Sequence, residues 1–403
     1  MNDSDRHAGF EEFTRTAAAR ERLLAAVTPT ERTERVALRA ADDRVVATTV
    51  DADRPVPHYE RAAMDGYAVR ASDTFGATER SPASLRVAET VRAGTATRVH
   101  TGSELPEGAD AVVMVEATDR TGDELTVFEA VPEGGNVGPV GEDVAAGQEL
   151  FEPGHVLRPS DLGLLKAVGL ESVDVYGRPR VSVVPTGEEL VQSDPEPGEI
   201  IETNGQTVTQ YVERWGGEAT YRDIVTDDAD ALRAAIERDL DHDIVVTTGG
   251  SSVGERDIVP EVVGELGEVF VHGVALKPGH PVALGVVEET PVLMLPGYPV
   301  ACIVNAVQFL RPALAAAGRR EARALPTTEA RLARKIASEP GVRTFARVAL
   351  ETGDEPTATP TRTKGAGVLS SVALSDGWVV VPEEREGYAE GATVAVEEWE
   401  ASR

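Results

Sequence analysis

Cysteine is almost absent from this sequence, since Cys302 is the only one among 403 residues. A single cysteine excludes an internal disulfide and fits a reducing compartment. Cys302 lies in an apolar stretch, so we expect it in the core and not as a nucleophile. The first residues are polar and acidic, and no later stretch approaches the roughly 18 apolar residues of a membrane span. We therefore expect a cytoplasmic protein that does not enter a membrane.

Lysine is also scarce, with four lysines among the 39 basic residues. The 69 acidic residues give a formal net charge of -30 at pH 7. Sequence-independent binding to nucleic acid needs basic surface that displaces counterions from phosphates, so this class of function is excluded. An acidic, arginine-biased surface is typical of proteins that stay soluble in high salt, where charge repulsion is screened. We predict a salt-loving source, such as a halophilic archaeon.

Several familiar catalytic signatures are missing. The sequence has no Walker loop, no G-x-G-x-x-G, no Cys/His cluster with zinc spacing and no evident Ser-His-Asp order. These absences argue against most common hydrolase, kinase and dehydrogenase classes. Hydrophobic residues still make up 41% of the chain, which is normal for a globular protein. Because 403 residues exceed one ordinary core, we expect three or four domains.

From about Arg178 the sequence alternates regularly between apolar runs and amphipathic stretches. This alternation predicts a parallel α/β sheet with helices on both faces. Residues 53–149 show short β-like runs broken by glycine and proline, and a β-type tail follows residue 323. The fold class is therefore a multidomain α/β and β protein. The predicted strands are 111–115, 125–128, 180–184, 219–225, 244–248, 282–286, 292–295, 379–381 and 393–396, and the predicted helices are 11–27, 158–170, 207–215, 230–240, 258–266 and 300–314.

The most distinctive segment is TTGGSSVGERD, which runs from Thr247 to Asp257 between a buried strand and a helix. Open α/β sheets bind ligands at such turns. Glycines let backbone N–H groups approach a phosphate, and serine hydroxyls add donors. Asp257 would repel a phosphate unless a divalent cation lay between them. Taken alone, a tight turn with an N-capping acid is an equally good interpretation. The proposed phosphate contacts are Gly249, Gly250, Ser251, Ser252 and Gly254.

Three further turns follow predicted strands, namely 185–190, the Asp227-Asp228 pair and 295–299. If the turns converge, Glu189, Asp227 and Asp257 share one cleft. Repulsion among three crowded carboxylates would raise their pKa values. A Mg²⁺ ion that bridges the carboxylates to a phosphate would offset this repulsion. A helix cap or solvated surface is the better interpretation of any single acid, but their joint placement favours the metal site.

Lys277 lies in KPGHP, where two prolines restrict the backbone and aim the ammonium group. An exposed loop lysine is hard to reconcile with so lysine-poor a surface, so we expect Lys277 to bind a phosphate or oxyanion. His280 is a second candidate anion contact, although a loop histidine more often has no such role.

These motifs occur in order with MDGYA at 64–68, TGSELPEGADAVV at 101–113, GED at 141–143 and an Asn204-Gly205 turn. With them the chain resembles the MoeA family, the molybdopterin molybdenumtransferases, which includes the E domain of gephyrin. The resemblance covers nearly the whole length. It implies that molybdate is inserted into adenylylated molybdopterin with release of AMP, assisted by Mg²⁺, to give the molybdenum cofactor.

The resemblance also implies a four-part architecture and an elongated homodimer, in which the second part of one chain faces the third part of the other. A molybdopterin adenylyltransferase is an expected partner, and no membrane partner is expected. The four parts are an elongated helical part (1–52 and 150–177), a β-rich part (53–149), a MogA-like α/β part (178–322) and a C-terminal β-barrel (323–403).

Residue by residue, the resemblance assigns roles to two sets of positions. Asp65, Thr101 and Asp143 match functional positions of the second part. Glu189, Asp227 and Asp257 are the expected Mg²⁺ ligands, by direct or water-mediated contact, and with the first three they form the catalytic set. The substrate-binding set is Thr186, Gly249, Gly250, Ser251, Ser252, Gly254, Lys277, His280, Pro296, Gly297 and Pro299.

Four positions depart from the family pattern. Glu188 replaces an aspartate, and His280 stands where many members have a second lysine. Tyr298 stands where many have asparagine, and Gly138 where an arginine often precedes GED. The loss of two permanent positive charges bears directly on the strength of oxyanion binding.

Three alternatives to molybdate insertion remain open at this point. A tungstate-inserting relative is one, since the two oxyanions are nearly isosteric. A molybdopterin adenylyltransferase is another, although the long N-terminal part argues against it. A non-catalytic molybdopterin-binding scaffold is the third, and the presence of Asp65, Asp227 and Asp257 argues against that.

Overall fold

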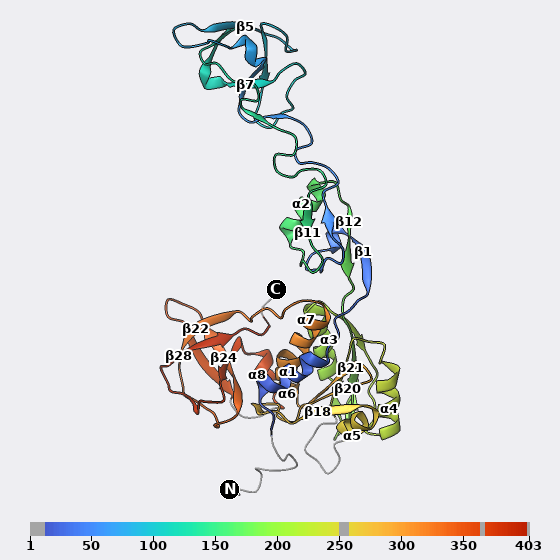
Figure 1. Cartoon of the computed structure of the whole chain (residues 1–403). Coiled ribbons are helices and arrows are strands. Elements are labelled where there is room, and N and C mark those ends of the chain that lie inside the picture. Colours follow the sequence, from blue (N-terminus) through green and yellow to red (C-terminus); the bar gives the residue numbers. More distant parts are fainter. Residues whose placement is uncertain (1–12, 250–257, 363–366, 401–403) are drawn as a thin grey trace. The chain divides into compact units, whose positions relative to one another are not determined.

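The computed structural model describes residues 13–249, 258–362 and 367–400 (Figure 1). The chain divides into two compact units. The first contains residues 1–32 and 176–403, and the second contains residues 33–175. Each unit has its own buried apolar clusters, as expected of a chain too long for one core.

The second unit contains a six-stranded sheet in the order β7-β4-β6-β5-β9-β8. Its inward-facing side chains, including Tyr67, Val113 and Leu125, form a separate core. The strands predicted at 111–115 and 125–128 are confirmed as β7 and β9. The elements are β4 (Gly66–Val69), η3 (Ala71–Asp73), β5 (Ala83–Val87), β6 (Thr95–Val99), β7 (Ala111–Met114), η4 (Val115–Ala117), β8 (Thr118–Thr121) and β9 (Glu124–Val127).

The rest of the second unit consists of two-stranded sheets, one α-helix and a 3-10 turn, and Leu157, Leu165 and Val175 belong to the largest of its apolar clusters. The helix predicted at 158–170 is present as α2, which begins with a proline, and the Asp161 carboxylate accepts from the Arg158 N–H at 2.9 Å. The elements are β1 (Thr33–Ala37), η2 (Leu38–Ala40), β2 (Val50–Asp51), β3 (Arg61–Ala62), β10 (Val137–Gly138), β11 (Glu149–Phe151), α2 (Pro159–Ala167) and β12 (Ser172–Tyr176).

The first unit is built on a six-stranded sheet in the order β16-β13-β17-β21-β20-β18. The expected parallel arrangement holds for the first four strands. β20 and β18 pair antiparallel, so the sheet is mixed. The reason is local, because only Glu288 and Glu289 separate β20 from β21, and a two-residue hairpin loop reverses the chain. The strands are β13 (Arg180–Pro185), β16 (Glu218–Tyr221), β17 (Ile244–Thr248), β18 (Glu268–His272), β20 (Ala283–Val287) and β21 (Thr290–Leu295).

Helices cover both faces of this sheet, as the sequence predicts. Alternate residues of β17 show the two faces, since Val246 packs with α3, α6 and α7 while Val245 packs with α4 and α5. The Asp228 side chain caps α4 by accepting from the Ala231 N–H at 2.9 Å. The helices are α3 (Asn204–Arg214), α4 (Ala229–Arg238), α5 (Ile258–Leu266), α6 (Pro299–Asn305), the π-helical turn η5 (Ala306–Leu310) and α7 (Arg311–Ala317).

The continuous helix Pro299–Ala317 is long and apolar enough to cross a membrane. Within the described residues it is the one such helix, and 78% of its apolar window is buried inside the protein. Cys302 is fully buried in it, as expected, and burial raises the pKa of the thiol. The hydropathy of this helix is therefore explained by its place in the core.

Helix α1 (Thr16–Ala26) belongs to the first unit, and its Ala19 and Leu23 pack into the core beside α7. Residues 33–52, which the predicted four-part division groups with α1, belong to the second unit together with residues 150–175. The four-part division stays a prediction.

The C-terminal residues form the predicted barrel. β24, β25, β22, β28 and β26 pair in a closed ring, because β26 pairs with both β28 and β24. The short strand β19 adds to this sheet beside β24. The elements are β19 (Leu276–Lys277), β22 (Thr327–Leu332), β23 (Ile336–Ala337), β24 (Arg343–Glu351), β25 (Thr357–Arg362), α8 (Ser370–Ala373), β26 (Gly377–Val381), β27 (Gly387–Tyr388) and β28 (Thr393–Glu397), with β14 (Leu190–Val191) and β15 (Ile200–Ile201) as a separate pair in the α/β part.

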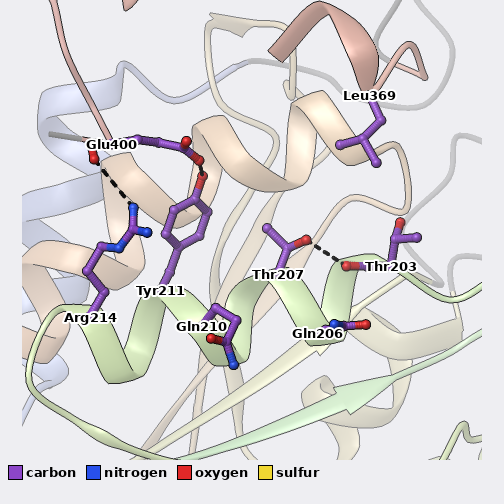
Figure 2. Close-up of a pocket in the computed structure, with 8 residues that line it drawn as sticks. All are labelled: Thr203, Gln206, Thr207, Gln210, Tyr211, Arg214, Leu369 and Glu400. Atoms are coloured by element: carbon purple, nitrogen blue, oxygen red, sulfur yellow. Dashed lines mark hydrogen bonds between the residues drawn. The ribbon is translucent and has the colours of Figure 1, made fainter. Parts of the chain in front are cut away.

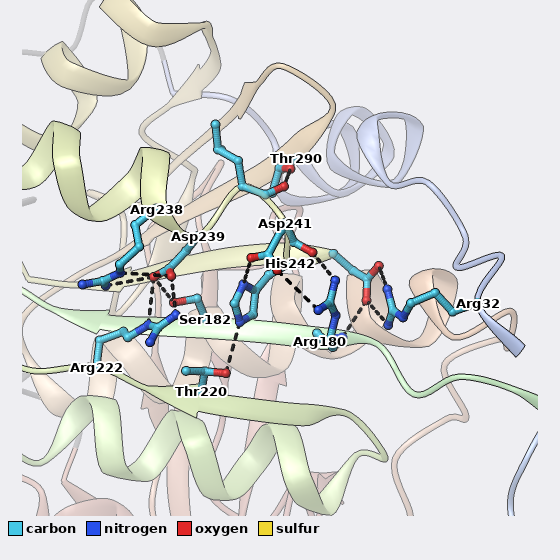
Figure 3. A network of polar contacts seen from close by, with 12 residues as sticks. Arg32, Arg180, Ser182, Thr220, Arg222, Arg238, Asp239, Asp241, His242 and Thr290 are labelled. Carbon is cyan, nitrogen blue, oxygen red and sulfur yellow. Dashed lines mark hydrogen bonds and ion pairs between the residues drawn. The ribbon is translucent and has the colours of Figure 1, made fainter. Parts of the chain in front are cut away.

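A polar network stabilises the amino-terminal end of the α/β sheet (Figure 3). Asp239 is fully buried there, and the Ser182 hydroxyl donates to it at 2.6 Å. Arg222 and Arg238 also converge on this carboxylate. Burial would raise the pKa of Asp239, but these hydrogen bonds outweigh it and lower the pKa to about 2. Asp239 is therefore charged at neutral pH and structural, at the end of the strands opposite to the candidate site.

Candidate functional site

Three neighbouring parallel strands, β13, β17 and β21, end at the same edge of the α/β sheet. Pro185 of β13 lies opposite Thr248 of β17, which lies opposite Leu295 of β21. The turns that follow these strands therefore begin side by side, and open α/β sheets bind ligands at this edge. The convergence predicted for the turns at 186, 249 and 296 is confirmed.

The backbones of these turns approach one another closely. A Cβ atom added to Gly249 would lie 2.1 Å from the Thr186 carbonyl oxygen, and the φ angle of Gly249 is +117°. The Cα atom of Gly249 also lies 3.5 Å from an ideal Cβ position of Gly297. The close Thr186 carbonyl and the positive φ angle each require glycine at position 249. The predicted contacts Thr186, Gly249 and Gly297 therefore lie together, with Pro296 buried between β21 and the turn.

Four buried polar atoms at this edge have no hydrogen-bond partner among the described residues. They are the hydroxyls of Thr186, Thr247 and Thr248 and one carboxylate oxygen of Asp227. Unpaired buried polar atoms are costly, and native proteins pair nearly all of them. Thr247 and Thr248 are consecutive in β17 and face opposite sides of the sheet, so a polar ligand at the strand ends would provide partners for the hydroxyls on its own side.

Asp227 and Glu189 are brought together as predicted. The Thr186–Val225 bridge places the PTGEEL turn beside the segment that leads to Asp227. Burial raises the pKa of Asp227 and the charge of Glu189 raises it further, whereas a hydrogen bond from the Glu188 backbone lowers it by more than the Glu188 charge raises it. Two facing carboxylates with an unpartnered oxygen are the hard donors that Mg²⁺ prefers.

The proposed third metal ligand, Asp257, lies outside the described residues, as do Gly250, Ser251, Ser252 and Gly254. Among residues 13–249, 258–362 and 367–400, no three His, Cys, Asp or Glu side chains group closely enough to hold a metal ion. The described part of the site thus offers two acids that fit a Mg²⁺ ion.

The N-terminus of α3 brings together Asn204, which belongs to one of the sequence motifs, and Glu202, which the sequence reasoning missed. The Asn204 amide donates to the Gly297 carbonyl at 2.6 Å, which joins α3 to the turn after β21. The buried Glu202 carboxylate accepts from the Gly205 N–H at 2.6 Å and from the Tyr221 hydroxyl at 2.7 Å. An acid shortly before a predicted helix was the available signal for this N-terminal role. Because the Glu202 carboxylate accepts from the Gly205 N–H, this N–H group is not available to a phosphate. The start of α3 therefore positions the site, and the predicted phosphate cradle remains the turn after β17.

Lys277 is the last residue of β19, and His280 lies in the loop that follows this strand. The Lys277 ammonium donates to Glu339 at 2.9 Å. Burial lowers the pKa of His280, and the charge of Lys277 lowers it further, while the His280 ring meets Phe13 edge-on at 5.7 Å between centroids. Asn305 of α6 donates to the Gly279 carbonyl at 2.9 Å, so the loop is fastened to the helix that begins at Pro299.

The candidates of the second unit are arranged as follows. The Asp65 carboxylate accepts from the backbone N–H and the hydroxyl of Thr101 at 2.7 and 2.9 Å. These hydrogen bonds lower the pKa of Asp65, so it is ionised at neutral pH. Asp143 is exposed after a turn in which its N–H donates to the Val56 carbonyl. Asp65 and Thr101 therefore form one polar pair, and no hydrogen bond or ion pair described for this unit joins Asp143 to it.

The departures from the family pattern also have structural settings. Tyr298 is 62% exposed at the start of α6. A Cβ atom at Gly138 would lie 2.7 Å from the Glu142 carboxylate, which pairs with Arg61. Any side chain at position 138 would therefore displace the Glu142–Arg61 pair.

A groove of about 330 Å³ runs along the exposed side of α3 (Figure 2). Figure 2 shows Leu369 above the helix and the Tyr211 hydroxyl pointing at Glu400, to which it donates at 2.5 Å. Burial and the neighbouring Glu400 raise the pKa of Tyr211. The groove holds none of the predicted site residues. Its lining is Thr203, Gln206, Thr207, Gln210, Tyr211, Arg214, Leu369 and Glu400.

Three family models match successive parts of the chain. They are the MoeA N-terminal region (domain I and II) at residues 14–169, a probable molybdopterin binding domain at 182–316 and the MoeA C-terminal region (domain IV) at 329–399. Molybdopterin molybdenumtransferase 2 of Mycobacterium tuberculosis is 34% identical, over 84% of this chain and 88% of its own. Molybdopterin molybdenumtransferase of Bacillus subtilis is 31% identical, over 90% and 89%. The crystal structure of a molybdopterin biosynthesis MoeA protein from Pyrococcus horikosii superimposes with a TM-score of 0.81 at 34% identity, over 97% of this chain and 100% of that one.

Proposed function

Because this chain belongs to the MoeA family, we propose that it inserts molybdate into adenylylated molybdopterin and releases AMP. This is the last step in the assembly of the molybdenum cofactor. The reaction is inferred from the family, and the carboxyl ends of β13, β17 and β21 are the inferred place of the reaction.

The observation that carries the proposal is the group of unpartnered buried oxygens at one sheet edge. The Thr186 hydroxyl is an unpartnered donor beside the glycine turn that opens at Gly249, and the hydroxyls of Thr247 and Thr248 lie on the two faces of β17 at the same edge. A phosphoanhydride has many acceptor oxygens and needs such donors. Asp227 supplies the opposite chemistry, a carboxylate that would repel the phosphates unless a cation lies between them.

Within the α/β part, each residue has a task that its chemistry allows. Asp227 and Glu189, joined by Asp257, would hold the Mg²⁺ ion, which neutralises phosphate charge when bound. Gly249, Gly250, Ser251, Ser252 and Gly254 would bind the phosphates through N–H and hydroxyl donors. Lys277 and His280 would hold the oxyanion, with Lys277 as the permanent charge. Thr186, Pro296, Gly297 and Pro299 would shape the substrate pocket.

The second unit contributes Asp65, Thr101 and Asp143 to the proposed site. We propose that these residues act on the α/β part of a second chain in a homodimer. The enzyme would accept its substrate from a molybdopterin adenylyltransferase in the cytoplasm, because the adenylylated compound must be made before it can be metallated.

The decisive experiment measures AMP release from adenylylated molybdopterin with Mg²⁺, with and without molybdate. We expect molybdate to trigger release by the wild type, and tungstate in parallel tests the alternative oxyanion. Asp257→Ala should lower the rate by more than about 100-fold, as expected when a group that stabilises phosphate charge is lost. Its circular dichroism spectrum should not change.

The matched control is Asp230→Ala, which removes an exposed acid of α4. It should release AMP at the wild-type rate. A wild type that releases no AMP on addition of either oxyanion would contradict the proposal and favour a non-catalytic scaffold. Formation of the adenylylated compound from ATP and molybdopterin would instead identify an adenylyltransferase.

A further inference from the structure

Lys277 is held by an acid of the barrel. Its ammonium lies 2.9 Å from the Glu339 carboxylate, and the two side chains are 52% and 69% exposed. Lys277 is the last residue of β19, which joins the barrel sheet beside β24, and Glu339 follows β23 in the barrel. The proposed oxyanion-binding lysine is therefore already engaged by a negative charge.

The backbone keeps this pair in register. β19, which contains Lys277, pairs with the start of β24, so that Lys277 lies opposite Thr344. The Arg343 N–H donates to the Ala275 carbonyl at 2.9 Å, which fastens the strands just before Lys277. The turn from Glu339 closes with a 3.2 Å hydrogen bond from the Val342 N–H to the Glu339 carbonyl. Glu339 is consequently presented to Lys277 by hydrogen-bonded backbone on both sides.

The neighbouring charges are balanced in the same way. Arg343 lies opposite Leu276, and its guanidinium binds the Glu383 carboxylate at 3.1–3.2 Å. His280 adds little positive charge, because burial and Lys277 both lower its pKa. A dianion that approaches Lys277 thus meets one permanent cation, which is already paired with an acid.

We propose that Glu339 is a built-in competitor for the oxyanion, which must displace its carboxylate from Lys277 before it can bind there. Glu339 then sets the affinity and the charge selectivity of this position, acting through Lys277. The inference rests on the proposed function for the identity of the oxyanion. The carboxylate of Glu339 opposes a fully ionised dianion such as molybdate both by competing for Lys277 and by repulsion.

The expected size of the effect follows from the exposure of the pair. Exposed ion pairs contribute at most about 1 kcal/mol, which corresponds to about fivefold in a dissociation constant. Glu339 therefore weakens oxyanion binding by up to about fivefold and does not block it. A contact of this strength changes the oxyanion concentration at which the site is half-filled but does not prevent binding.

The test is equilibrium dialysis of molybdate alone against the full-length protein, without adenylylated molybdopterin. Glu339→Gln should lower the dissociation constant by about threefold to fivefold. In the AMP-release assay it should lower the KM for molybdate and leave kcat unchanged. Glu339→Asp keeps the charge and should return the dissociation constant toward that of the wild type.

The matched control is Glu384→Gln, which removes the same charge from an exposed position of the barrel. It should change molybdate binding by less than about 1.5-fold, because screening weakens distant exposed charges. Equal effects of Glu339→Gln and Glu384→Gln, an unchanged constant in Glu339→Gln, or no molybdate binding to the wild type would each overturn the inference. Failure of AMP release alone would overturn the proposed function and leave this binding result standing.

Discussion

At the scale of single residues, Asp227 is the most informative position in the described site. One of its oxygens is buried without a partner, and Glu189 faces it. Burial is the larger cause of its raised pKa, and repulsion from Glu189 comes second. An ionised carboxylate that is partly buried beside a second carboxylate destabilises the fold. Residues that are retained for chemistry often destabilise the fold in this way.

The pKa of Asp227 gives a testable pH dependence. Because it is raised above 3.8, the folded protein binds this proton more readily than the unfolded chain. Stability from this group therefore falls as pH rises above 3.8, and the ionised form destabilises the fold at pH 7. Asp227→Asn should raise the melting temperature at pH 7 by about 1–2 °C, and this gain should vanish near pH 4.

The same variant should lose AMP release by more than about 100-fold, since it removes a proposed Mg²⁺ ligand. Asp230→Asn serves as the control for AMP release, which it should leave at the wild-type rate. A lower melting temperature of Asp227→Asn at pH 7 would show that the Asp227 charge stabilises the fold instead.

At the scale of elements, the turn after β17 is determined by close backbone contact. Gly249 approaches the Thr186 carbonyl, and its N–H donates to the Leu295 carbonyl at 3.0 Å. This turn therefore connects the ends of all three strands that bear the site. The sequence segment TTGG predicts a permissive turn, but the contact that requires the glycine involves residues far away along the chain.

Replacement of this glycine should damage fold and site together. Gly249→Ala should lower the free energy of unfolding by more than about 2 kcal/mol, because the new methyl group meets backbone and the φ angle is unfavourable. Urea unfolding and AMP release measure the two effects. Gly264→Ala in helix α5 is the control. Its new Cβ atom would lie 4.0 Å from the Val269 side chain, an ordinary contact distance, so it meets no clash. It should raise the free energy of unfolding by about 0.5–1 kcal/mol. Wild-type stability in Gly249→Ala would show that the turn adapts easily.

At the scale of the whole molecule, the dominant property is the net charge of -30. Basic partners are found for some acids, such as Asp239 and Asp243, but 39 basic residues cannot pair with 69 acidic ones. Repulsion among the remaining acids opposes folding and is screened by salt.

Stability should therefore depend strongly on ionic strength. Raising KCl from 0.1 to 2 M should increase the melting temperature by on the order of 10 °C, because the Debye length falls from about 10 Å to below 3 Å. Sucrose is the control, since it strengthens burial without screening charge. A protein that melts at the same temperature and is equally active without added salt would contradict the high-salt hypothesis.

The sequence by itself determined the local elements and the composition of the site. Apolar periodicity gave the four parallel strands and their helices, because side-chain burial repeats with the geometry of each element. The order of short motifs gave the family, with Asp227, Glu189 and Lys277 among the expected functional residues.

Only the tertiary structure decided which of these residues meet and what opposes them. The contact of Asn204 with Gly297, the close approach of Gly249 to Thr186 and the pairing of Lys277 with Glu339 all join segments far apart in sequence. Periodicity reports the environment of one segment at a time, so it carries no information on such partners. Burial and charge at a site come from the packing of several segments, which only the folded chain provides.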